Sequence, residues 1–256
     1  MTISPRFRSF VREHSAHSML LPLAHSTDNK CLIDLLEAPR LLPKHRPEYE
    51  EDLFFTYYGR PSYRLHPDID ATSVTAVHAT AFLLDPRHMP LVHRVVAFDS
   101  GAMDLGLYKS AMHRDFTKQT FEVDPDLESA SRIVRAFYDD HEDYCAGKPN
   151  RATVSEMQPE AQCYQDLLTS KLAAEADDRK SCVEIQFCSE IALNADTVLA
   201  VILPKQSYKE PTIRSFIDNE LEAKALTYIC TGGKPSEDAV MMKEKAFDFY
   251  FRTGRL

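Results

Sequence analysis

Three separated segments of this sequence carry side chains that could do chemistry together. The first is a polar turn, His25-Ser26-Thr27, and the second is Tyr57-Tyr58-Gly59-Arg60. An imidazole, an aromatic surface and a guanidinium beside a flexible glycine are the groups that an anionic, aromatic ligand needs. The third segment contributes Glu184, a carboxylate that would make the bound ligand react.

Hydrophobic periodicity predicts the elements that position these side chains. Residues 18–25 are expected to form a first strand that ends at the polar turn, and residues 29–38 form a helix. Residues 53–58 form an aromatic strand, in which Tyr57 and Tyr58 point in opposite directions, so only one of them can stack on a ligand. The acid lies in a strand over residues 182–187, where alternation puts Glu184 and Gln186 on one face.

The rest of the chain mixes strands and helices. Residues 43–52 are charged and contain prolines, which predicts a surface loop. Strands over residues 74–84 and 92–98 are separated by a turn and are expected to pair with each other. Further elements are helices over residues 125–144, 159–176, 211–223 and 236–251, and strands over residues 197–203 and 225–230. This order favours an α+β fold over a doubly wound parallel sheet.

Composition narrows the class of protein. The chain has 256 residues, of which 44% are hydrophobic, and a formal net charge of −9, which argues against unspecific attraction to nucleic acids or anionic membranes. A local basic groove remains open, because five arginines fall in one third of the chain: Arg46, Arg60, Arg64, Arg87 and Arg94. The six cysteines show no CxxC spacing and are expected to be reduced thiols of a cytoplasmic protein. No segment has the pattern of a signal peptide or a membrane span.

Several well-known motifs are missing. None of the seven glycines makes GxGxxG or a P-loop, and Gly233-Lys234 is followed by proline. The sequence also has no HExxH and no GxSxG. These absences exclude Rossmann dehydrogenases, Walker-type ATPases, zincin proteases and ordinary α/β-hydrolases. A nucleotide would have to be held in another way.

Three blocks of the sequence resemble ADP-ribosyltransferases. The letters HST followed by LIDLL are similar to the opening of DarT-like enzymes and RNA 2′-phosphotransferases, in which a His-x-Thr turn precedes a helix. The block EEDLFFTYYGRPSYR resembles the aromatic strand of DarT-like proteins, which leads to an arginine near the cofactor. The block SCVEIQFCSEIAL, followed by TVLAVILP, resembles their catalytic-glutamate strand and the hairpin after it.

The resemblance implies a fold of split antiparallel sheets with flanking helices, and NAD as substrate in the cleft. Glu184 would be the catalytic residue that stabilises the positive ribose as the nicotinamide bond breaks. His25, Ser26 and Thr27 would bind NAD, with His25 and Thr27 hydrogen-bonding the adenine-side ribose or the nicotinamide amide. Arg60, and also Arg64, would pair with the pyrophosphate, and Tyr57 or Tyr58 would stack on nicotinamide. No metal is implied.

The sequence contains no convincing linker, which predicts a single domain, and the resemblance implies the partners of that domain. We expect one α+β domain over residues 1–256: an N-terminal arm (1–17), an NAD-cleft half (18–123), a helical insertion (124–180) and a catalytic-glutamate half (181–256). The acceptor of ADP-ribose would be a macromolecule, either nucleic acid or protein. A role as a toxin or phage-defence effector is typical of the family, with a neutralising antitoxin or operon partner. The position two residues before the acid, Cys182, departs from the Glu or Gln of many relatives, which leaves the acceptor open.

Other interpretations of the same residues remain. Asp68 or Asp70 could join Glu184 and Gln186 around Mg²⁺ in a nuclease-like site, although the usual lysine after the glutamate is missing. The chain could instead be a nucleotide-binding module without turnover. Each residue alone also fits a plain structural role, such as an exposed strand carboxylate, a turn histidine or packing tyrosines. Asp99 and Arg94 are further candidates for the cleft border that the sequence does not position.

Overall fold

A central sheet organises the molecule. The structure is a computed structural model that describes residues 5–62, 69–150, 154–171 and 178–256. The strands of the sheet are β1 (Leu23–Asp28), β3 (Lys44–Arg46), β4 (Glu51–Tyr58), β5 (Ala79–Leu84), β6 (Arg94–Val96), β7 (Glu184–Phe187), β9 (Val198–Pro204) and β10 (Lys224–Tyr228). They follow the order β10-β9-β5-β1-β4-β7-β6, with β3 paired to β4. A separate pair is formed by β2 (Arg40–Leu41) and β8 (Ile191–Ala192).

The pairing of the sheet is mixed. All neighbours are antiparallel except β9 and β10, which run parallel because two short helices carry the chain back between them. The mixed sheet with flanking helices agrees with the expected α+β organisation, whereas the expectation of antiparallel sheets is wrong for this last pair. The expected pairing between the strands at 74–84 and 92–98 is also wrong. β5 lies between β1 and β9, while β6 pairs with β7, which comes much later in the chain.

The sheet is divided at its centre. β1 pairs with β5 along its whole length, from Leu23 to Asp28. On its other edge it pairs with β4 only through Leu23 and Ala24, opposite Tyr58 and Tyr57. Beyond that point the two strands separate. The predicted turn at residues 25–27 is therefore wrong, because these residues continue the strand and are held there by β5.

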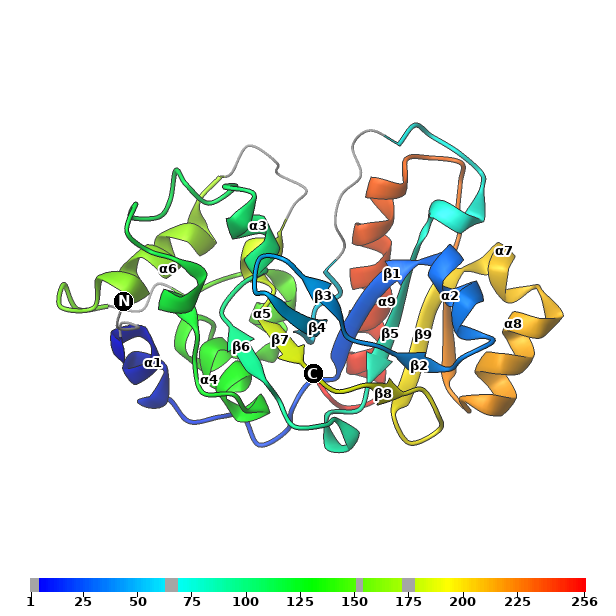
Figure 1. The fold of residues 1–256 in the computed structure, drawn as a ribbon, viewed down its shortest axis with the longest axis horizontal. Coiled ribbons are helices and arrows are strands. Elements are labelled where there is room, and N and C mark those ends of the chain that lie inside the picture. The colour runs from blue at the N-terminus through cyan, green and yellow to red at the C-terminus, as the bar shows by residue number, and fades with distance from the viewer. Residues whose placement is uncertain (1–4, 63–68, 151–153, 172–177) are drawn as a thin grey trace.

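Helices lie at both ends of this divided sheet (Figure 1). At the end of β6 and β7 are α1 (Pro5–Arg12), α3 (Ser100–Asp104), α4 (Leu127–Phe137), α5 (His141–Ala146) and α6 (Pro159–Thr169). At the other end are α7 (Lys205–Tyr208) and α8 (Pro211–Ser215), while α2 (Asn29–Leu35) packs against β1 and β5, and α9 (Asp238–Arg252) packs against β5, β9 and β10. None of the helices within the described ranges is both long and apolar enough to cross a bilayer.

Capping residues explain where the helices break. The expected helix over 125–144 is two helices, because the Asp140 side chain accepts a hydrogen bond from Asp143 N and starts α5. Asp126 caps α4 in the same way, through Ser129 N. The first of the two helices thus begins two residues later than the Asp124-Pro125 signal suggested. The predicted segment 124–180 contains α4, α5 and α6, and its status as an insertion stays a prediction.

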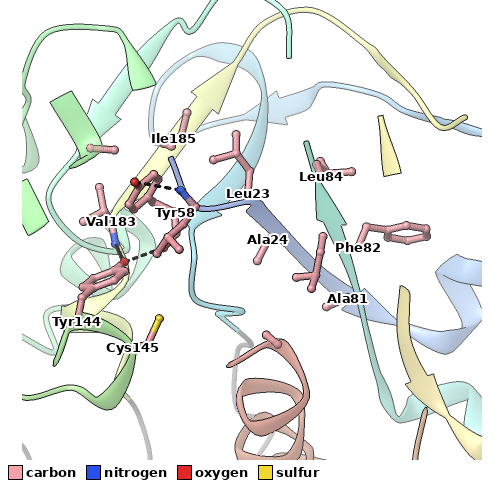
Figure 2. Close-up of a cluster of buried hydrophobic side chains, with 14 of the residues drawn as sticks. Leu23, Ala24, Tyr58, Ala81, Phe82, Leu84, Tyr144, Cys145, Val183 and Ile185 are labelled. Carbon is pink, nitrogen blue, oxygen red and sulfur yellow. Dashed lines mark hydrogen bonds between the residues drawn. The ribbon is translucent and has the colours of Figure 1, made fainter. Parts of the chain in front are cut away.

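A buried cluster joins the two central strands, β1 and β4, to helix α5 (Figure 2). Tyr58 is fully buried, and its backbone carbonyl accepts a hydrogen bond from the Tyr144 hydroxyl at 2.8 Å. The same hydroxyl accepts a bond from Val183 N at 3.3 Å. One tyrosine of α5 therefore fixes the end of β4 against the start of β7. This contact sets the frame for the polar residues next to it, Tyr57 and Glu184.

Candidate active site

A cavity of about 550 Å³ opens where β1 and β4 separate. Its wall includes five residues that the sequence singled out: His25, Ser26, Thr27, Tyr57 and Glu184. They come from β1, β4 and β7, three strands that are far apart in the chain. The volume lies within the range of pockets that enclose small molecules and cofactors.

His25 bridges the opening between the two strands. Its Nδ1 donates a hydrogen bond to the carbonyl oxygen of Phe55 at 2.9 Å, since a carbonyl can only accept. The ring packs against Phe54, with a centroid distance of 4.3 Å. Burial lowers the pKa of His25 to about 4, so the ring is neutral at pH 7. With the proton on Nδ1, Nε2 is an acceptor.

Glu184 is held by three donors. It is paired in register with Tyr57 of β4 and is 1% exposed. Ser100 donates twice, from its backbone N at 3.1 Å and from its hydroxyl at 2.8 Å. The side-chain amide of Gln186 donates at 2.6 Å, so the expectation that these two residues share one face is confirmed. The carboxyl group is therefore fixed in orientation at the cavity wall.

A second acid stands close to Glu184 and changes its chemistry. Burial, and then the charge of Asp99, raise the pKa of Glu184 to about 8, against the opposing effect of its hydrogen bonds. Asp99 accepts a hydrogen bond from the Tyr57 hydroxyl at 3.0 Å and caps α3 through Ala102 N at 3.0 Å. Both acids line the cavity. A cationic ligand group beside this pair would favour the ionised form of Glu184.

Gln186 connects Glu184 to an outer layer of charged residues. Its amide nitrogen donates to Glu184 and also to the Tyr49 hydroxyl at 2.9 Å. Its carbonyl oxygen accepts from Arg94 Nη1 at 2.5 Å. Arg94 is held in turn by Glu51 at 3.1 Å. This chain of contacts fixes the amide orientation, so that its N–H group faces the acid.

Cations line the same cavity on the side of β3. Lys44 and Arg46 occupy alternate positions of this strand and both contribute to the wall. The Arg46 guanidinium lies 4.8 Å from the centre of the Phe55 ring. Among the described residues, nothing accepts a hydrogen bond from the buried Arg46 Nε, and nothing pairs with the buried Ser26 hydroxyl. These groups are available to an anionic or hydroxyl-bearing ligand.

No family model, curated protein or solved structure matches this chain. Its function is therefore inferred from the cavity and the side chains that line it.

Arg60 lies away from the cavity and has a structural role. Its guanidinium donates to the carbonyl oxygen of Tyr144 and to Asp178, and its side chain is 4% exposed. Asp178 also pairs with Lys243 at 2.6 Å. The structure thus corrects the expectation that Arg60 meets a pyrophosphate, because Arg60 is absent from the cavity wall and both of its Nη groups bind inside the protein. Arg64 lies outside the described residues.

Tyr58 and Gly59, which precede Arg60, are also enclosed by the protein. Tyr58 is part of the core, and its hydroxyl accepts a hydrogen bond from Leu21 N at 3.1 Å. Tyr57 alone of the two tyrosines reaches the cavity, as strand alternation requires. Gly59 has φ +65°, and a Cβ at this position would lie 2.5 Å from Leu21 Cδ1. The glycine is thus needed for close packing rather than for the approach of a ligand.

The site includes residues that sequence reasoning missed. Ser100, Lys44 and Leu53 were not predicted to line a cavity, and Asp99 and Arg46 were named without a position. The sequence Asp99-Ser100 at the end of an apolar strand is a helix N-cap signal, which would have found this turn. The nuclease-like reading gains no support: Asp70 is exposed and absent from the cavity wall, and Asp68 lies outside the described residues. In the ranges described, no three acidic, histidine or cysteine residues cluster as metal ligands would.

Proposed function

We propose that this protein is an ADP-ribosyltransferase that binds NAD in the cavity between β1 and β4. It would break the bond between nicotinamide and ribose and transfer ADP-ribose to a nucleic acid or protein acceptor. The observation that carries the proposal is the meeting of His25, Tyr57 and Glu184 in one cavity at the division of the sheet. The resemblance of the sequence blocks implies the same three contributions to an NAD cleft.

The pair of acids suits the chemistry of this bond. Nicotinamide in NAD carries a positive charge, and the ribose becomes positive as the bond breaks. A carboxylate against the sugar stabilises that charge most when it is buried and preorganised. Glu184 is both, because Ser100 and Gln186 hold it from three donors. The cationic ring would lower the pKa of Glu184 on binding, so that the carboxylate forms when the substrate is present.

The cavity wall also offers binding partners for the other parts of NAD. Lys44 and Arg46 take the place expected of Arg60 as partners of the pyrophosphate, because they line the cavity on one strand. The ring of Tyr57 offers a flat surface, while its hydroxyl is held by Asp99. The unpaired Ser26 hydroxyl and the Nε2 of His25 can meet ribose hydroxyls or the nicotinamide amide. A role as a toxin or defence effector under the control of a neutralising partner belongs to the same hypothesis.

The test is nicotinamide release from NAD by the purified protein, followed by chromatography. Glu184→Gln should slow release on the order of 100-fold or more, while binding of NAD is retained. Glu190→Gln is the matched control, because this exposed acid lies just after β7 and pairs only at 3.6 Å with Arg40. Binding of NAD without release in the wild type would instead favour a nucleotide-binding module. Absence of both binding and release refutes the proposal.

A further inference from the structure

A second cluster of reactive side chains lies outside the cavity. Cys230 Sγ lies 3.0 Å from His78 Nε2, and His78 Nδ1 lies 2.8 Å from Asp238 Oδ2. His78 precedes β5, Cys230 follows β10, and Asp238 is the first residue of α9. None of the three lines the cavity between β1 and β4. A thiol, an imidazole and a carboxylate in this order form the arrangement that activates cysteine nucleophiles.

The hydrogen bonds around His78 define the state of the ring. Nδ1 faces the carboxylate of Asp238, and Nε2 faces the carbonyl oxygen of Thr72 at 3.0 Å as well as the sulfur. A carboxylate and a carbonyl are acceptors only, so both ring nitrogens act as donors. The geometry thus suits a doubly protonated imidazolium that is balanced by Asp238. An imidazolium beside a cysteine favours the thiolate, which is the nucleophilic form.

Asp238 is held in place by the backbone. Its Oδ2 atom also accepts a hydrogen bond from Ala79 N at 3.0 Å, and the side chain of Asp238 is 3% exposed. The acid therefore cannot turn away from His78 without losing a buried contact. Cys230 is also buried, but not completely. Cys230 is 9% exposed and stands between two exposed residues, Ile229 and Thr231.

We propose that Cys230 is a reactive cysteine that small electrophiles modify, and that hydroperoxides oxidise it to the sulfenic acid. The limited exposure of Cys230 fits a small attacking partner. The thiolate sulfur attacks one oxygen of hydrogen peroxide, an S–O bond forms, and the O–O bond breaks. The leaving hydroxide takes a proton from the His78 imidazolium and departs as water. Sulfur is oxidised and the peroxide is reduced, with no further reactant.

The first experiment uses the wild-type protein alone. It is treated with iodoacetamide for short times between pH 5 and pH 9, and alkylation of each cysteine is followed by peptide mass spectrometry. An ordinary thiol is only about 3% ionised at pH 7 and loses about tenfold in rate for each pH unit below that. Cys188 is the internal control because it is exposed. Cys230 should react about tenfold faster than Cys188 at pH 6, and equal or slower reaction of Cys230 overturns the proposal.

The second experiment separates activation from simple access. Asp238→Asn keeps the size of the side chain but removes the charge that balances the imidazolium, so alkylation of Cys230 should slow by about tenfold. Glu244→Gln, an exposed position on the same helix, should leave the rate unchanged. A rate in Asp238→Asn equal to that of the wild type overturns the activation by His78. If circular dichroism shows that Asp238→Asn is unfolded, the wild-type ratio of Cys230 to Cys188 decides alone.

The oxidation is tested with hydrogen peroxide and dimedone, which traps sulfenic acids as a stable adduct. The adduct should form on Cys230 at lower peroxide concentration than on Cys188. Adducts on Cys188 at equal or lower concentration contradict the assignment. Because NAD is absent from these reactions, the outcome is independent of the function proposed for the cavity.

Discussion

Replacement of Glu184 by glutamine should remove part of the pH dependence of the free energy of unfolding. Burial and the charge of Asp99 raise the pKa of Glu184 from 4.5 to about 8. Between these values the unfolded chain has released a proton that the folded protein keeps, so the free energy of unfolding of the wild type falls as pH rises. At about 1.36 kcal/mol for each pKa unit, the whole shift corresponds to about 5 kcal/mol. Glutamine has no proton to release, and the variant escapes this loss.

The assay is urea denaturation followed by circular dichroism at pH 5, 6, 7, 8 and 9. The variant should differ little from the wild type at pH 5 and then gain about 1.4 kcal/mol for each pH unit, up to about 5 kcal/mol above pH 8. Glu190→Gln should follow the wild type, because Glu190 is more than half exposed, with a side-chain exposure of 57%. Parallel curves for the wild type and Glu184→Gln would mean that Glu184 ionises like an ordinary acid. That result would refute the reasoning from burial and from Asp99.

Three further predictions concern other parts of the fold, and urea denaturation measures the stability of each variant. Gly59→Ala should lower the free energy of unfolding by about 2 kcal/mol or more, since its Cβ meets Leu21, whereas Gly254→Ala, with φ +68° and open space, should cost only about 1 kcal/mol. Arg60→Met should lower the free energy of unfolding by about 3 kcal/mol and leave the affinity for NAD, measured by calorimetry, unchanged. Arg46→Met should instead weaken NAD binding about tenfold at unchanged stability. Burial lowers the pKa of His141 to about 3. Below pH 6.5 the unfolded chain therefore binds a proton that the folded protein does not bind, and the free energy of unfolding of the wild type should fall by about 1.4 kcal/mol per pH unit on acidification. His141→Gln should lose less, and an identical acid slope in both proteins contradicts the assignment.

The sequence predicted the parts of the site that depend on local pattern. The alternation of short strands is a local property, so it identified the shared face of Glu184 and Gln186 and the opposite directions of Tyr57 and Tyr58. The side chains at residues 25–27 were also predicted to meet a ligand, although they lie in a strand instead of a turn. Their position at the cavity follows from the separation of β1 and β4, which periodicity does not report.

The errors have two causes, a contact between distant segments at Arg60 and a misleading charge pattern at residues 43–52. Arg60 resembled a ligand-binding residue because its partner Asp178 lies in a different third of the chain. The segment 43–52 was expected to be a loop because it is charged and contains prolines. In the structure Lys44 to Arg46 pair with β4, and the tight connection places Glu50 at φ +56°. Charge alone could not distinguish a solvated loop from an edge strand that turns its cations toward a cavity.

The separation of β1 from β4 leaves a strand edge inside the molecule. In antiparallel sheets every second residue directs its amide and carbonyl groups toward one neighbouring strand. Along residues 25–28 that neighbour is present on the β5 side and has turned away on the other. Side chains such as His25, which donates to the carbonyl oxygen of Phe55, as well as water or a guest molecule, can satisfy main-chain groups along this gap. Hydrogen bonds to the main chain do not depend on the side chain. Substitutions at residues 25–28 should therefore change which ligand is preferred more readily than they abolish ligand binding.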